Sequence, residues 1–196
     1  MTSLEPRRFK ARLMAKGYTQ KKRVNFKKVF SSLVRHASIR LFLALIVVQD
    51  MELDQLDVKT IFLHERLEEE IFMAQSEGYE DLEKPKHVCV LKKSFNGLKQ
   101  SSRQWYLKFD EFMVTHEFMR CNCDCCVYYK LLRVNLYINF ILYMENMLIA
   151  YKEKSDIENL TLVLNSEFDL KNLRTVRKIL GVEIERIRIK GLIYLS

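Results

Sequence analysis

Two acidic positions in the sequence join apolar stretches to turns, and they suggest a site built from carboxylates. Asp57 lies in the stretch "LDQLDVKTIFL" (53–63), and Glu145 and Asn146 interrupt the apolar ribbon "YINFILYMENMLIAY" (137–151). A strand end and a hairpin tip of one antiparallel sheet can lie side by side. Converging carboxylates bind divalent cations, and two such metals support in-line phosphoryl transfer. The alternative is that these turn carboxylates are only solvated.

The elements that must position these residues form an α+β pattern, with antiparallel hairpins packed against helices. A helix is expected over 36–49 with Ser38 as a candidate cap, and a second helix begins at Ser101. A third helix follows the capping-box pair Ser155 and Glu158. Asn96-Gly97 predicts a turn. Strands are predicted over 51–63, 69–75, 87–93, 178–189 and 191–196, and a hairpin over 136–151.

Composition indicates one compact domain with a single core. The chain has 196 residues, of which 48% are hydrophobic. The longest apolar run, "LFLALIVV" (41–48), is too short to cross a membrane. The N-terminal stretch contains no apolar segment of the secretory type. No membrane association is therefore predicted.

The charge is concentrated at one end of the chain. The formal net charge is +8, and residues 1–40 hold twelve of the 33 Lys and Arg residues but one of the 25 acidic residues, Glu5. A basic arm on a mildly acidic body suggests contact with a polyanion such as nucleic acid, and a solvated charged face is the alternative.

The segment "RCNCDCC" (120–126) invites comparison with zinc sites, with His116 nearby. Structural zinc ligands come in pairs two to four residues apart on two separate arms. Cys89 is the only cysteine outside this segment, so a second pair of cysteine ligands is missing. We therefore expect no zinc, and we interpret the five cysteines as thiols of a protein from a reducing compartment.

Eight segments of the chain together resemble one known family. They are "FKARLMAKGYTQ" (9–20), "VRHASIRLFLAL" (34–45), "LDQLDVKTIFL" (53–63), "LEEEIFMAQSEGY" (67–79), "LKKSFNGLKQSSRQWY" (91–106), "CVYYK" (126–130), "LYMENMLIAYK" (142–152) and "KILGVEIER" (178–186). They occur in family order over nearly the whole chain, which therefore resembles the reverse transcriptase of copia-type LTR retrotransposons.

The resemblance implies a partial right-hand polymerase fold over residues 1–196. Residues 1–50 correspond to a basic, fingers-like part and residues 51–196 mainly to the palm, an antiparallel sheet packed on helices. The thumb and the RNase H domain are expected to be absent. The activity implied is RNA-directed DNA synthesis by two-metal nucleotidyl transfer with Mg²⁺ or Mn²⁺. The implied partners are an RNA or DNA primer–template and dNTPs, and the implied location is a cytoplasmic virus-like particle. The oligomeric state is not indicated.

The resemblance also assigns roles to single residues. Asp57 matches the first catalytic aspartate, the carbonyl of Val58 would contact the metal, and Glu145 and Asn146 occupy the positions of the catalytic pair. Trp105 and Tyr106 match packing residues of a helix. The nucleotide-binding positions implied are Lys59, Thr60, Ile61, Phe62, Gly97, Lys99 and Gln100. The nucleic-acid-binding positions in the basic arm are Arg7, Arg8, Lys10, Arg12, Lys16, Lys21 and Lys22.

The largest departure from the family falls on the catalytic hairpin. The family has Tyr-Val-Asp-Asp, whereas this chain has Tyr143-Met144-Glu145-Asn146. Glu145 keeps the charge but displaces it, and the Asn146 side chain is neutral. Other family prolines and turn residues are also replaced, at Ser32, Glu65, Ser76, Ser102, Asn172 and Arg174. These departures indicate a degenerate copy with lost or strongly impaired activity. The alternatives are a non-catalytic nucleic-acid-binding module and a relic without function.

Overall fold

The computed structural model of the protein describes residues 14–21, 26, 28, 31–58, 66–144, 146–168, 170–176, 178–179 and 181–196. The helices are η1 (Gly17–Thr19), α1 (His36–Val48), α2 (Ser101–Thr115), α3 (Lys154–Glu167) and η2 (Arg188–Lys190). The strands are β1 (Glu52–Val58), β2 (Arg66–Ala74), β3 (Val88–Lys93), β4 (Met119–Cys121), β5 (Asp124–Arg133), β6 (Leu136–Tyr143), β7 (Asn146–Tyr151), β8 (Leu170–Thr175), β9 (Lys178–Ile179), β10 (Val182–Ile187) and β11 (Leu192–Leu195).

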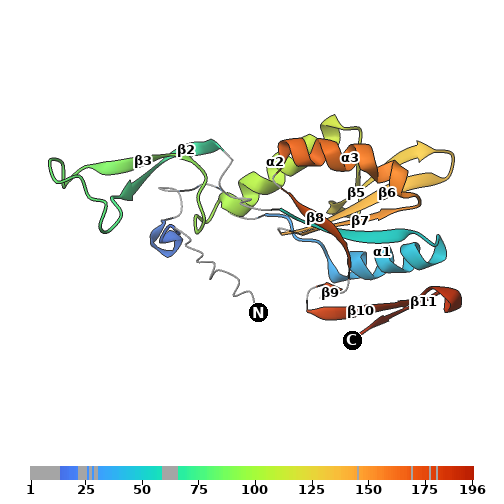
Figure 1. The fold of residues 1–196 in the computed structure, drawn as a ribbon. Coiled ribbons are helices and arrows are strands. Elements are labelled where there is room, and N and C mark those ends of the chain that lie inside the picture. The colour runs from blue at the N-terminus through green and yellow to red at the C-terminus, as the bar shows by residue number, and fades with distance from the viewer. Residues whose placement is uncertain are drawn as a thin grey trace, which may run out of the picture.

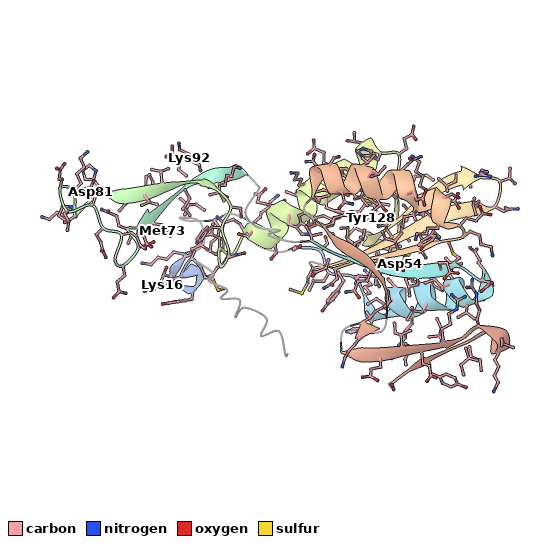
Figure 2. All side chains as sticks on the ribbon, in the orientation of Figure 1. Lys16, Asp54, Met73, Asp81, Lys92 and Tyr128 are labelled. Atoms are coloured by element: carbon pink, nitrogen blue, oxygen red, sulfur yellow. The ribbon has the colours of Figure 1, made fainter. Side chains whose placement is uncertain are left out.

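The body of the protein is a six-stranded sheet in the order β4-β5-β6-β7-β1-β8. Helices α2 and α3 lie on one face of this sheet, and α1 lies on the other face (Figure 1). A small sheet, β11-β10-β9, lies beyond α1, while the β2–β3 ribbon projects past the end of α2 (Figure 1). Lys16, Met73, Asp81 and Lys92 belong to the projecting part, whereas Asp54 and Tyr128 belong to the body (Figure 2). The mixed helix and antiparallel-sheet architecture confirms the predicted α+β class.

The core is the packing of apolar helix faces on both sides of the sheet. Helix α1 buries Ile39, Phe42, Leu43 and Ile46, a spacing of three and four residues that places them on one face. Strands β6 and β7 are buried almost continuously, from Ile138 to Leu142 and from Met147 to Tyr151. A strand covered on both faces needs apolar side chains on both, which explains why "YINFILY" and "MLIAY" do not alternate with polar residues.

The capping predictions for two helices were wrong. The N-cap of α1 is Arg35 instead of Ser38, whose hydroxyl donates to Asp124 Oδ2 at 2.6 Å. The capping box of α3 is formed by Glu153 and Asp156, two residues before the predicted pair. Strand β7 ends at Tyr151, so the helix begins almost at once, and a carboxylate instead of a hydroxyl supplies the capping oxygen.

Two other predictions of secondary structure also need correction. The expected strand over 178–189 is divided into β9 and β10, because Gly181 adopts a φ of 85° and turns the chain between them. Strand β8 was not predicted. Its sequence, "LKNLRT", does not alternate clearly between apolar and polar residues, and its place at the edge of the sheet comes from pairing with β1.

Asp124 is the buried polar residue that connects the sheet to the start of α1. Its Oδ2 accepts hydrogen bonds from the Arg35 backbone N–H at 2.9 Å and from the Ser38 hydroxyl, and its Oδ1 accepts from the Cys126 N–H at 3.0 Å. Only 5% of Asp124 is exposed. Removing this acceptor leaves one buried and two partly buried donors without this partner, which is strongly unfavourable.

Asp124→Ala is therefore expected to lower the free energy of unfolding by about 3 kcal/mol. Ser38→Ala removes only one of the three bonds and is the matched control, with an expected loss of about 1 kcal/mol. Urea denaturation followed by circular dichroism measures both. Equal losses in the two variants would contradict the central role of Asp124.

Candidate active site

The β6–β7 hairpin brings its tip against β1. Asn146 is paired with Tyr143 across the hairpin and with Asp57 across the β1–β7 ladder. Met144, in the turn, has a φ of 50° and an exposed side chain. Glu145 lies outside the described residues. The predicted neighbourhood of Asp57 and the hairpin is thus confirmed for Asn146.

The Asn146 side chain is held by a neighbouring amide. Gln55 Nε2 donates to Asn146 Oδ1 at 2.5 Å. Gln55 and Asp57 are two residues apart on β1, so their side chains share one face of the sheet. The oxygen that Asn146 could offer to a cation therefore already accepts a hydrogen bond. Sequence reasoning missed this contact because Gln55 and Asn146 lie far apart in the chain.

Trp105 fixes the turn of the same hairpin from the side of α2. Its indole Nε1–H donates to the backbone carbonyl of Met144 at 3.1 Å. The ring packs edge-on against Phe168, with centroids 5.1 Å apart, and only 4% of the residue is exposed. The prediction that Trp105 and Tyr106 are packing residues is confirmed by their burial. The hydrogen bond to the hairpin was not predicted, because periodicity reports burial and not the direction of a polar group.

The other residues expected at the catalytic centre are only partly described. Asp57 is half-buried in β1, and Val58, the last residue of that strand, is 5% exposed. The nucleotide-binding stretch Lys59, Thr60, Ile61 and Phe62 lies outside the described residues. The described part therefore provides one carboxylate, that of Asp57, and one neutral amide at the expected metal position. A divalent cation prefers several charged oxygen ligands, and the side chain of Asn146 supplies no charge.

The predicted loop around Gly97 packs against the start of the described chain. Gly97 has a φ of 94°, which suits glycine, and a Cβ added to it would lie 2.3 Å from the Ala15 carbonyl oxygen. A Cβ added to Gly17 would lie 1.8 Å from the Gly97 carbonyl oxygen. The two backbones approach so closely that both positions require glycine.

Lys99 and Gln100 also belong to this contact. The Gln20 side-chain amide donates to Gln100 Oε1 at 3.1 Å and accepts from the Lys99 N–H at 2.9 Å. Lys99 Nζ donates to the Gln20 carbonyl at 3.0 Å and lies 5.1 Å from the centre of the Phe26 ring. Lys99 and Gln100 hold the loop to the basic arm, and their contact with a nucleotide stays a prediction.

Part of the basic arm can be placed. Lys16 and Lys21 are described, and Lys16 lies beside η1, close to the β2–β3 ribbon (Figure 2). Arg7, Arg8, Lys10, Arg12 and Lys22 lie outside the described residues. Their role in nucleic-acid binding stays a prediction.

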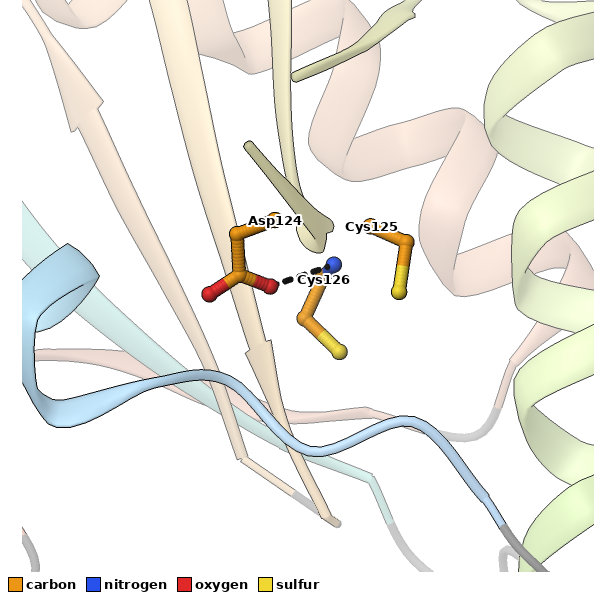
Figure 3. A group of neighbouring side chains, drawn as sticks. All are labelled: Asp124, Cys125 and Cys126. Carbon is orange, nitrogen blue, oxygen red and sulfur yellow. Dashed lines mark hydrogen bonds between the residues drawn. The ribbon is translucent and has the colours of Figure 1, made fainter. Parts of the chain in front are cut away.

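The cysteine segment has one group with metal-ligand chemistry within the described chain, Asp124, Cys125 and Cys126, whose ligand atoms lie within 4.8 Å of one another (Figure 3). Both oxygens of Asp124 already accept hydrogen bonds. Burial raises the pKa of the Cys126 thiol to about 12, which disfavours the thiolate that a metal requires. These contacts support a structural role, and the expectation that zinc is absent stays a prediction.

Comparison with known proteins gives the same assignment as the resemblance. The family described as reverse transcriptase (RNA-dependent DNA polymerase) matches residues 2–196. The chain is 47% identical over 189 residues to the retrovirus-related Pol polyprotein from transposon TNT 1-94 of Nicotiana tabacum. It is 31% identical over 180 residues to that from transposon RE1 of Arabidopsis thaliana. These matches cover 96% and 92% of this chain, respectively.

The chain spans 14% of the tobacco polyprotein and 12% of the Arabidopsis one. A yeast relative, the Ty1-NL2 Gag-Pol polyprotein of Saccharomyces cerevisiae, is 23% identical over 194 residues. No solved structure matches the fold. Among the described residues, no helix is long and apolar enough to cross a membrane. The family match over nearly the whole chain shows that this protein belongs to the reverse transcriptase family, as the reverse transcriptase domain of a copia-type retrotransposon Pol polyprotein.

Proposed function

We propose that this chain keeps the right-hand polymerase fold of its family, in fingers-like and palm parts, while its nucleotidyl transfer is lost or strongly impaired. The observation that carries the proposal is the pairing of Asn146 with Asp57, together with the hydrogen bond from Gln55 to Asn146. An amide in that place adds no charge beside Asp57, and its oxygen already accepts a hydrogen bond.

The residues present fit the family's Mg²⁺ poorly. A bound divalent ion would supply stabilisation of the attacking and leaving oxygens. The sequence keeps Asp57 and Val58 of the family's metal ligands, but Glu145 carries one more methylene than aspartate and Asn146 is neutral. This ligand set therefore supports the family's two-metal transfer step poorly.

The roles of the remaining residues are part of the same proposal. Asp57 would be the surviving catalytic carboxylate, with Lys59 to Phe62 and the Gly97 loop at the incoming nucleotide. The basic arm, including Lys16 and Lys21, would contact the backbone of an RNA or DNA primer–template. A net charge of +8 supports that contact, because cationic side chains displace counterions from nucleic acid. The family's cytoplasmic particle is the proposed location.

A primer-extension assay tests the proposal directly. The chain is incubated with an RNA template, a DNA primer, dNTPs and Mg²⁺, and then with Mn²⁺. Extension is expected to be no greater than that of Asp57→Ala, which removes the remaining catalytic carboxylate. Extension by the unchanged chain that Asp57→Ala abolishes would show that Glu145 and Asn146 are tolerated.

A second candidate function is nucleic-acid binding without chemistry, and the charge of residues 1–40 favours it. Fluorescence anisotropy with a labelled primer–template distinguishes it from a relic without function. A binding module gives an affinity that falls steeply with salt and is unchanged in Asp57→Ala. A relic gives no salt-dependent binding, or no cooperative unfolding transition.

A further inference from the structure

The β4–β5 hairpin holds two thiols in direct contact. Cys121 ends β4, Asn122 and Cys123 form the turn, and Asp124 begins β5. The sulfur atoms of Cys121 and Cys123 lie 2.7 Å apart. Cys123 is exposed and Cys121 is half-buried, so both can be reached from solvent. Neither thiol takes part in the candidate active site.

The separation of the two sulfurs is close to that of a covalent bond. A disulfide has a sulfur–sulfur distance of about 2.04 Å. The two sulfurs therefore need to approach by only about 0.7 Å for the bond to form. A turn with two residues between its paired positions leaves the thiols few ways to separate, since Cys121 and Asp124 are paired across the hairpin.

The residues on both sides of the turn are anchored to the body. Arg120, which precedes Cys121, forms an ion pair with Asp110 on α2 at 3.2 Å. Asp124, which follows Cys123, is bound to Arg35 and Ser38 at the start of α1. Helices on opposite faces of the sheet thus hold the two ends of the turn. The two thiols are held near each other before any reaction. This favours formation of a disulfide between them over reaction with a thiol from solution.

The contact also makes the two thiols differ in pKa and therefore in reactivity. A hydrogen bond from Cys123, with the backbone amides of Cys123 and Asp124, lowers the pKa of Cys121 below its usual value. The same contact raises the pKa of Cys123. Cys121 is therefore the better nucleophile near neutral pH, because the thiolate is the reactive form.

We propose that Cys121 and Cys123 form a thiol–disulfide exchange site that is oxidised by low-molecular-weight disulfides. The Cys121 thiolate attacks one sulfur of the small disulfide, forms a mixed disulfide and releases one small thiolate. The Cys123 thiolate then attacks Cys121 Sγ, breaks the mixed disulfide and releases the second small thiolate. The protein loses two electrons and two protons, and the small disulfide becomes two thiols.

The other cysteines of the chain provide internal controls. Cys126 is completely buried, and its raised pKa keeps it protonated. Cys125 and Cys89 are exposed free thiols. Cys125 neighbours Cys126 on β5 (Figure 3), and their sulfur atoms lie within 4.8 Å of one another, but Cys126 is buried and stays protonated, so it is a poor resolving thiol. An exposed thiol without a reactive neighbouring thiol forms a mixed disulfide that persists.

The test uses the folded chain carrying Cys89→Ser and Cys125→Ser, with glutathione disulfide as the probe. Intact mass spectrometry after alkylation is expected to show the loss of two hydrogens and no retained glutathione. Adding Cys123→Ser is expected to leave one glutathione on Cys121. A further variant carries Cys121→Ser and Cys123→Ser and keeps Cys125. The reaction of Cys121 with glutathione disulfide in the first protein is expected to be about three to ten times faster than that of Cys125 in this variant.

Two results would overturn the proposal. One is retained glutathione on Cys121 while Cys123 is present, because the resolving step would then be missing. The other is a reaction rate at Cys121 no greater than that at Cys125. Thermal melts of all variants identify any loss of folding. A Cys123→Ala variant is also expected to retain one glutathione on Cys121, which shows that the serine hydroxyl plays no part. The outcome is independent of polymerase activity.

Discussion

Replacing Glu145 and Asn146 by aspartate in one double variant is expected to raise primer extension about 10²- to 10⁴-fold above the unchanged chain. This factor corresponds to about 3–5 kcal/mol of transition-state stabilisation, the scale expected for recovering well-placed metal ligands. The fold should accept the change, because an aspartate at 146 still accepts a hydrogen bond from Gln55 Nε2. The new carboxylate lies opposite Asp57, where a divalent cation relieves the repulsion between them.

The assay needs a control that changes charge without rebuilding the site. Asn135→Asp is matched, because it makes the same change from asparagine to aspartate in a hairpin turn at the opposite end of β6. It is expected to leave extension at background. Asp57→Ala added to the restored pair is expected to remove the gained activity.

Two further readouts make a negative result decisive. Primer–template anisotropy checks that the restored chain binds nucleic acid as the unchanged chain does, and a thermal melt checks that it folds. If the restored chain folds and binds but does not extend, the hairpin is not the only lesion, and the expectation that restoring the pair is sufficient is contradicted. Mg²⁺ is also expected to raise the melting temperature of the restored chain more than that of the unchanged chain.

Much of the site's framework could be predicted from the sequence because local signals agree there. Two apolar runs separated by a polar pair predict a hairpin, and the structure places it over 136–151 as expected. Asp57 lies near the end of a β-rich stretch, and antiparallel pairing then brings it opposite Asn146. The helices that cover the sheet follow from apolar spacing, as in α1 and α2.

Contacts between distant segments could not be predicted in the same way. The Gln55–Asn146 hydrogen bond joins residues 91 positions apart, and Ala15 donates to Asn96 from a separate part of the chain. The Asp124 anchor was also missed, since an aspartate beside cysteines carries no local sign of its partners at α1. These contacts depend on register and packing, which single-sequence patterns do not specify.

Trp105→Ala is expected to lower the free energy of unfolding by about 3–5 kcal/mol, because a large buried ring is lost and a cavity remains. For a chain of 196 residues this corresponds to a fall in melting temperature of about 6–20 °C. Trp105 packs against Phe109 and Phe168, with ring centroids 5.8 and 5.1 Å away, so the loss reaches the contact between α2 and α3.

Trp105→Phe separates this packing from the hydrogen bond to the hairpin. It keeps an aromatic ring but removes the donor to the Met144 carbonyl, and the expected loss is about 1–2 kcal/mol. Urea denaturation followed by far-ultraviolet circular dichroism measures both variants. Fluorescence cannot be used, because Trp105 is the single tryptophan of the chain. Tyr194→Ala, at an exposed position on β11, is the control and is expected to change stability little.

The hydrogen bond from Trp105 also connects the helix layer to the candidate active site. In the chain with Glu145→Asp and Asn146→Asp, adding Trp105→Phe is expected to lower primer extension about tenfold at a temperature where the protein remains folded. The physical reason is that the turn carrying the carboxylates loses its only described side-chain anchor from α2, so the ligands are held less closely in place. Unchanged extension in a stable variant would contradict this positioning role and leave Trp105 as a packing residue alone.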